Sequence, residues 1–137
     1  MSLKYLLDTN IVSEPLRPQP NQTILANLQT HQQEIAIAAV VWHELWFGCL
    51  RLPLSRRRTA VETYLQHVVS AIPILPYDEQ AAHWHAAERA RLTAQGKPPP
   101  FADSQIAAVT AVNHLQLVTL NTADYAYFQG LQLTTWN

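Results

Sequence analysis

Several features that mark common binding sites are scarce or missing in this sequence. The three glycines, at positions 48, 96 and 130, lie too far apart to form a glycine-rich loop around a nucleotide phosphate. The single cysteine, Cys49, excludes an internal disulfide framework and favours a reducing compartment. The six histidines show no zinc-site spacing, and no cluster of thiolates accompanies them. Nucleotide-cradling loops, disulfide scaffolds and zinc sites are therefore not expected.

Long apolar runs and a strong net charge are also missing. The longest uninterrupted apolar run, Ile35–Trp42, is far shorter than the ~20 residues that a membrane-spanning helix needs, and the N-terminus shows no secretory pattern. We therefore predict a cytoplasmic protein with no membrane partner. The net charge of −1 does not indicate a general nucleic-acid binder, but affinity for phosphates depends on where the basic residues lie.

What the sequence does contain is an alternation of short apolar strands with helices. A length of 137 residues with 48% apolar residues is typical of one globular domain, which we assign to residues 1–137. The expected strands are residues 3–7, 34–38, 72–75, 116–120 and, more weakly, 131–136; the expected helices are residues 9–16, 21–32, 39–50, 55–71, 78–96 and 102–115. This pattern predicts a three-layer α/β fold, with a central, mostly parallel sheet of four to five short strands flanked by helices.

Four acidic residues occupy positions that this fold would bring together. Asp8 directly follows the first strand, and Asp124 follows the fourth in "VTLNTADY". Asp103 opens the helix before the fourth strand, and Glu44 lies near the start of the helix after the second. Ligands of parallel α/β sheets bind beyond the carboxyl ends of the strands, where the strand order reverses. If the first and fourth strands are neighbours, the four carboxylates face one cavity.

Each acid also has a purely structural interpretation. Asp8 and Asp103 are suited to cap helices, and Asp124 is suited to a turn. Glu44 lies in an apolar stretch, "VVWHELWFG", where a carboxylate needs a partner. The acids predicted on solvated helix surfaces are Asp78, Glu79 and Glu88.

Converging carboxylates have a definite chemistry. Without a cation between them they would repel one another strongly. Ligation by oxygen alone selects hard ions, which here means Mg²⁺ or Mn²⁺. Such an ion activates a water for attack on phosphorus and stabilises the leaving oxygen. The favoured reaction is therefore phosphodiester hydrolysis.

The ordered set "LLDTN", "HELWFG", "FADSQIAA" and "LVTLNTADY" resembles the PIN-domain ribonucleases, in particular the VapC-type toxins of bacterial toxin–antitoxin pairs. The resemblance covers nearly the whole chain. It implies a single PIN-like domain in which four acids are catalytic and bind the metal, and three polar residues support them. The implied acids are Asp8, Glu44, Asp103 and Asp124, and the implied supporting residues are Asn10, Thr119 and Asn121. The segment "KPPPF" differs from the glycine-containing loop that is commoner in the family.

The resemblance also implies an activity and partners. It suggests a metal-dependent endoribonuclease, the toxin of a type II toxin–antitoxin module, acting on tRNA, rRNA or mRNA. It further implies a small cognate antitoxin and a homodimer. Within this interpretation, Arg56, Arg57 and Arg58, with Lys97, would steer RNA toward the acids. The alternative is that the arginine run is a solvated loop and helix start.

Other functions are less compatible with the sequence. A haloacid-dehalogenase-type phosphatase needs a second Asp two residues after the first, where this chain has Asn10. A receiver domain needs a phosphoacceptor Asp directly after its third strand, and Asp78 is set back beyond a proline. A PIN fold that serves only as a scaffold would lack the acids.

One aromatic cluster admits two interpretations. Trp42, Trp46 and Phe47 cannot all face one core, because Phe47 is rotated by ~100° from Trp46 on a helix. Either two of them belong to the core, or one or more line an exposed groove. Such a groove would receive the C-terminal segment of the antitoxin.

Overall fold

Five short parallel strands form the centre of the molecule, in the order β3-β2-β1-β4-β5. This computed structural model describes residues 2–137. The strands are β1 (Tyr5–Leu7), β2 (Ile35–Ala38), β3 (Ile74–Leu75), β4 (Gln116–Val118) and β5 (Gln132–Thr134). The expected sheet is confirmed, and in the described residues its strand pairs are all parallel.

The strand order reverses at β1. The chain passes outward from β1 to β2 and β3, then returns so that β4 pairs with the other edge of β1. In the register, Leu6 lies opposite Ala36 on one side and Leu117 on the other. The first and fourth strands are thus neighbours, as the acidic cavity requires. A ligand site is expected beyond the carboxyl ends of β1 and β4.

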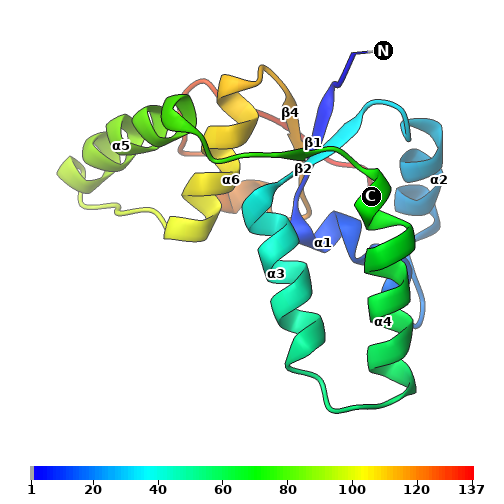
Figure 1. Ribbon diagram of the computed structural model, residues 1–137. Coiled ribbons are helices and arrows are strands. Elements are labelled where there is room, and N and C mark those ends of the chain that lie inside the picture. The colour runs from blue at the N-terminus through cyan, green and yellow to red at the C-terminus, as the bar shows by residue number, and fades with distance from the viewer. Residues whose placement is uncertain (1) are drawn as a thin grey trace.

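Helices surround this sheet (Figure 1). They are α1 (Thr9–Val12), α2 (Gln22–Thr30), α3 (Ala39–Leu50), α4 (Arg56–His67), α5 (Glu79–Ala94) and α6 (Phe101–Val112). Short 3₁₀ turns are η1 (Glu14–Leu16), η2 (Val69–Ala71) and η3 (Thr122–Asp124). In the view of Figure 1, α5 and α6 lie together to the left of the sheet and α2 lies to the right. Helices α3 and α4 project below it as an antiparallel pair.

The core lies where the central strands meet the helices. Strands β1, β2 and β4 are buried on both faces, as their apolar runs predict. Leu6, Leu117 and Val109 of α6 are fully buried, and Cys49 is the small buried hydrophobe that its apolar neighbours suggest. Near the C-terminus, Trp136 packs edge-on against Tyr5. The end of the chain is therefore part of the core.

Helix boundaries follow local signals in most cases. Asn21, Ser55 and Asp78 accept a hydrogen bond from the first turn of α2, α4 and α5. Helix α5 ends before Gly96, whose φ of +74° suits glycine. The helix predicted at 55–71 is shorter than expected, because α4 stops at His67 and the chain continues as η2.

The prediction of a solvated Glu88 is wrong. Its side chain is buried and accepts two hydrogen bonds from Arg91, each 2.8 Å long. It accepts a third from the backbone N–H of Gln129, and Arg91 also donates to the carbonyl of Tyr127. The Glu88–Arg91 ion pair of α5 therefore holds the segment after η3 in place through these hydrogen bonds. A carboxylate in this position is buried because it has these partners.

Within residues 2–137, we find no helix with the length and apolar character needed to cross a membrane.

Candidate active site

Asp8 lies at the carboxyl end of β1, where the chain turns into α1. It is buried, and both carboxylate oxygens accept hydrogen bonds: Oδ1 from the N–H of Thr9 at 2.8 Å, and Oδ2 from the hydroxyl of Thr119 at 2.8 Å. Asp8 is also the N-cap residue of α1, so its structural interpretation is correct as well. These contacts fix the orientation of the carboxylate at the switch point of the sheet.

Glu44 reaches the same place from α3. Its Oε1 accepts a hydrogen bond of 3.0 Å from the hydroxyl of Thr9, the residue whose N–H holds Asp8. One residue of α1 therefore orients two carboxylates from different elements. Sequence reasoning did not identify Thr9, although its position directly after Asp8 was the available signal.

Asp103 comes from the first turn of α6 and is joined to Asp8 by a tyrosine. The hydroxyl of Tyr125 lies 3.3 Å from Asp103 Oδ1 and 3.3 Å from Asp8 Oδ2. Tyr125 is buried, and a buried tyrosine hydroxyl usually has a hydrogen-bond partner. Asp103 is not a helix cap, because the N-cap position of α6 is Pro100. Sequence reasoning also missed Tyr125, which directly follows Asp124.

Asp124 stands at the rim of the cluster. It is exposed and forms the end of η3, where its N–H donates to the carbonyl of Asn121. The turn role is therefore correct. Its charge nevertheless reaches the cluster, because it helps to raise the pKa of Asp103.

The three supporting residues contribute in different ways. Thr119 donates to Asp8 and accepts the N–H of Asn121, so it links the acid to the loop after β4. Asn10 accepts the N–H of Leu120 at 3.4 Å and stabilises that loop from α1. Asn121 takes part through its backbone, and its side chain is exposed.

The electrostatics of the cluster are those of crowded, partly buried acids. Burial raises the pKa of Glu44, and the charges of Asp8 and Asp103 raise it further, against the hydrogen bond from Thr9. Burial likewise raises the pKa of Asp103, with the charges of Asp8 and Asp124 acting in the same direction. Burial and the two neighbouring acids also raise the pKa of the Tyr125 hydroxyl, which therefore stays protonated and donates.

Among residues 2–137, none of the four acids forms an ion pair with a Lys, Arg or His. We also searched residues 2–137 for groups of three or more His, Cys, Asp or Glu side chains that could hold a metal ion by themselves. None of these residues form such a group. A hard cation in this cluster would therefore take many of its ligands from water and substrate, which is how Mg²⁺ is commonly bound. The unneutralised, oxygen-only donor set fits such an ion.

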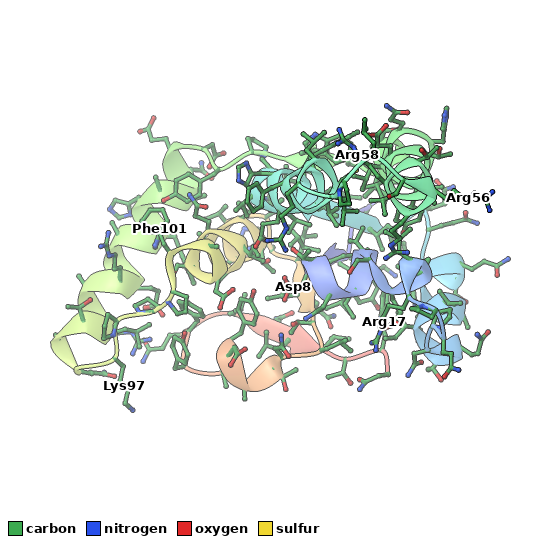
Figure 2. All side chains as sticks on the ribbon, turned by 90° about the horizontal axis from the view of Figure 1, so that it is seen from below. Asp8, Arg17, Arg56, Arg58, Lys97 and Phe101 are labelled. Atoms are coloured by element: carbon green, nitrogen blue, oxygen red, sulfur yellow. The ribbon has the colours of Figure 1, made fainter. Side chains whose placement is uncertain are left out.

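The arginine run lies apart from the acids. Arg57 donates to the carbonyl of Leu16 at 2.8 Å, and Arg58 pairs with Glu62 at 2.9 Å. In Figure 2, Arg56 and Arg58 lie to one side of Asp8, whereas Phe101 and Lys97 lie to the other.

Two hollows flank α3. An open cleft of about 910 Å³ lies between α3 and the start of α6, and Thr9 and Glu44 are among its lining residues. A smaller hollow of about 410 Å³ is lined by Trp42, Trp46 and neighbouring residues of α3. Trp42 and Trp46 are half-buried against the core, while Phe47 is 58% exposed.

The arrangement is that of a known family. The PIN domain family matches residues 5–127 of this chain. Toxin FitB of Neisseria gonorrhoeae is 32% identical over 124 residues, which cover 88% of this chain and 89% of FitB. The tRNA(fMet)-specific endonuclease VapC of Shigella flexneri is 31% identical over 135 residues, covering 98% of this chain and 99% of the relative.

Solved structures agree with the sequence comparison. The structure of FitAB bound to an IR36 DNA fragment superposes with a TM-score of 0.87 at 28% identity, covering 97% of this chain and 96% of that one. DNA-bound VapBC from Salmonella typhimurium gives a TM-score of 0.87 at 25% identity, covering 98% and 99%. From its sheet, its cluster of acids and these similarities, the chain belongs to the PIN domain family, beside the VapC-type toxins and ribonucleases.

Proposed function

We propose that this chain is a divalent-metal-dependent endoribonuclease, the toxin of a type II toxin–antitoxin pair. The observation that carries the proposal is the cluster of Asp8, Glu44 and Asp103 at the switch point of a PIN fold, without a basic side chain paired to it among residues 2–137. The relatives named as ribonucleases support RNA as the substrate.

The four acids are proposed to hold Mg²⁺ or Mn²⁺. Asp8, Glu44 and Asp103 would bind the ion directly or through water, with Asp124 assisting from the rim. A bound ion of this kind supplies an activated water and neutralises charge on the phosphate. Oxygen-only donors favour these two metals over softer ones.

The remaining residues orient the acids. Thr119 and the N–H of Thr9 fix the carboxylate of Asp8, and the Thr9 hydroxyl fixes that of Glu44. Tyr125 holds Asp8 and Asp103 at a set separation through one hydroxyl. This preorganisation matters because in-line attack on a phosphodiester depends on the position of the reacting groups.

The proposed partners follow from the relatives. FitAB and VapBC have been solved bound to DNA, and VapBC is named as a family of toxin–antitoxin systems, which supports a cognate antitoxin for this chain. A homodimer and a cytoplasmic location, where RNA substrates are present, complete the proposal.

The test is cleavage of RNA by purified variants. Asp8→Asn and Asp103→Asn should abolish Mg²⁺- or Mn²⁺-dependent cleavage and keep the fold, whereas Asp78→Asn, at an exposed helix cap outside the acidic cluster, should cut normally. EDTA should reversibly abolish RNA cleavage by the wild-type protein. Sequencing of the RNA ends should show 5′-phosphates and 3′-hydroxyls. Wild-type activity in Asp8→Asn, or activity that persists in EDTA, would refute the proposed site.

A further inference from the structure

The cleft beside the acidic cluster has two exposed aromatic rings at its mouth. Phe47 of α3 is 58% exposed and Phe101 at the start of α6 is 54% exposed. Large apolar side chains exposed together beside a proposed catalytic site usually serve a ligand. The rings lie on opposite walls, because the cleft runs between α3 and α6.

Each ring is accompanied by a cation. The guanidinium of Arg51 lies 5.4 Å from the centroid of Phe47, and that of Arg89 lies 5.5 Å from the centroid of Phe101. The ring of His43 is parallel to that of Phe47, with an interplanar angle of 1° and centroids 6.3 Å apart. Flat rings and planar cations are the groups on which unpaired nucleic-acid bases stack.

The Phe101 platform has a rigid support. Three prolines, residues 98–100, precede it and restrict the backbone that presents the ring. Behind it, the buried ring of His85 packs edge-on at 4.8 Å, and its Nδ1 is 2.8 Å from the Tyr77 hydroxyl. Burial lowers the pKa of His85. Arg89 lies over the Phe101 ring but does not itself line the cleft.

The cleft is continuous with the carboxylates. Glu44 and Phe47 of α3 and its C-cap residue, Arg51, follow one another at spacings of three and four, so they form a stripe along one face. The stripe is about 10 Å long. It leads from a proposed metal-binding acid, past the exposed ring of Phe47, to the guanidinium of Arg51. The smaller hollow at Trp42 and Trp46 is largely apolar and better suits a protein segment.

We propose that this cleft binds an unpaired nucleotide of the RNA beside the scissile phosphate, with its base held between the Phe47 and Phe101 walls and its phosphate near Arg51. The inference rests on the proposed ribonuclease function and adds two substrate-positioning residues to it. Phe47 and Phe101 hold the base so that the neighbouring phosphate lies at the acids.

The experiment measures binding of a fluorescein-labelled single-stranded RNA by variants in the Asp8→Asn background, which prevents cleavage. Phe47→Ala and Phe101→Ala should each weaken binding about tenfold, and Phe101→Trp should restore it. Arg51→Gln should lower the slope of log affinity against log salt by about 0.7. The matched controls are Leu54→Ala, an exposed apolar residue in the α3–α4 loop, and Lys4→Gln, a surface cation before β1; both should bind as the background does.

Abasic substitutions in the RNA locate the stacked base. One position next to the cleavage site should lose affinity when made abasic, and that loss should vanish in Phe101→Ala. If wild-type protein cuts RNA but the phenylalanine variants bind like Leu54→Ala, the cleft inference alone fails. If the wild type neither binds nor cuts RNA, the proposed function fails together with it. If Phe101→Ala weakens only the binding of a partner protein, the cleft is a docking site and the inference is wrong.

Discussion

The hydroxyl of Tyr125 lies 3.3 Å from Oδ2 of Asp8, although the two residues are 117 positions apart in the chain. The same hydroxyl lies 3.3 Å from Asp103. Its single proton serves two carboxylates, so Tyr125 sets how far apart they lie.

Tyr125→Phe should therefore impair the cluster without removing any acid. The ring would still fill the core, but both carboxylates would lose a donor. We expect the Mg²⁺ concentration for half-maximal RNA cleavage to rise by about tenfold or more, as when other orienting partners of metal ligands are removed. The metal-free protein should lose about 1 kcal/mol of unfolding free energy. Tyr5→Phe, at the opposite end of β1, is the control, and equal metal dependence in the two variants would contradict this role.

Removal of one acid should stabilise the metal-free protein. Glu44 and Asp103 are held near Asp8, and no Lys, Arg or His of the described part of the chain pairs with them, so their charges oppose folding. Asp103→Asn should thus melt at a higher temperature than the wild type in EDTA, and saturating Mg²⁺ should raise the melting temperature of the wild type more than that of the variant. Calorimetry in EDTA and in Mg²⁺ measures both effects. A lower metal-free melting temperature for Asp103→Asn would show that the hydrogen bond from Tyr125 stabilises the fold more than repulsion among the acids destabilises it.

The ion pair between Glu88 and Arg91 should make stability depend on acid pH. The hydrogen bonds from Arg91 lower the pKa of Glu88 below its usual 4.5. The folded carboxylate therefore stabilises the protein above pH 4.5, and this contribution disappears as the pH falls through the lowered pKa. Glu88→Gln should melt lower than the wild type at neutral pH, and the gap should close on acidification. Glu79→Gln, at an exposed position on the same helix, should differ less from the wild type in melting temperature at neutral pH. Equal differences for the two variants would contradict a stabilising role for the Glu88–Arg91 ion pair.

The arginine run remains a prediction about RNA approach. Replacement of Arg56, Arg57 and Arg58 by alanine should weaken RNA binding and flatten its salt dependence without a change in metal affinity. Because Arg58 pairs with Glu62, the single variant Arg58→Ala is needed to separate a stability effect from a loss of RNA contact. If the slope of log affinity against log salt is unchanged in the triple variant, the three arginines are solvated surface residues and do not contact RNA.

The hollow on α3 is predicted to receive the antitoxin. Trp46→Ala should weaken binding of the protein encoded by an adjacent antitoxin gene by roughly 2 kcal/mol or more and spare RNA cleavage. Trp46 also packs edge-on against Trp42, with centroids 5.8 Å apart, so its truncation has a folding cost. Leu50→Ser provides a second variant, since Leu50 lines the same hollow and is 54% exposed. If a folded Leu50→Ser protein binds the antitoxin normally, the hollow is not part of the antitoxin interface.

The sequence predicted the elements and the placement of acids better than it predicted their contacts. Helix α3 has the expected bounds, and its buried residues Val41, Leu45 and Cys49 recur at the expected helical spacing. Asp8 could be placed at a strand end because the apolar run stops just before it, and Asp124 could be placed in the segment shortly after the fourth strand. The pairing of β1 with β4 could be stated only as a condition for a shared acidic cavity, since no local pattern specifies which strands become neighbours; the structure meets this condition.

The sequence pattern could not predict contacts between segments that are far apart in the chain. Glu88 lies on the buried stripe of α5 with His85 and Leu92, but in an alanine-rich helix the periodic signal is weak. Its burial depends on Arg91 and on the backbone of Gln129 arriving from another element. The double contact of Tyr125 likewise depends on three elements meeting at one point, and neighbouring residues in the chain give no sign of it.

The position of β4 beside β1 has a consequence during protein synthesis. Asp8 is translated early, but Asp103, Thr119 and Tyr125 come from the last third of the chain, and the core also needs Trp136. A nascent chain cannot assemble the acidic cluster until the segment that contains Tyr125 has left the ribosome. The site is thus completed late in translation, long after Asp8 and the first strand have emerged.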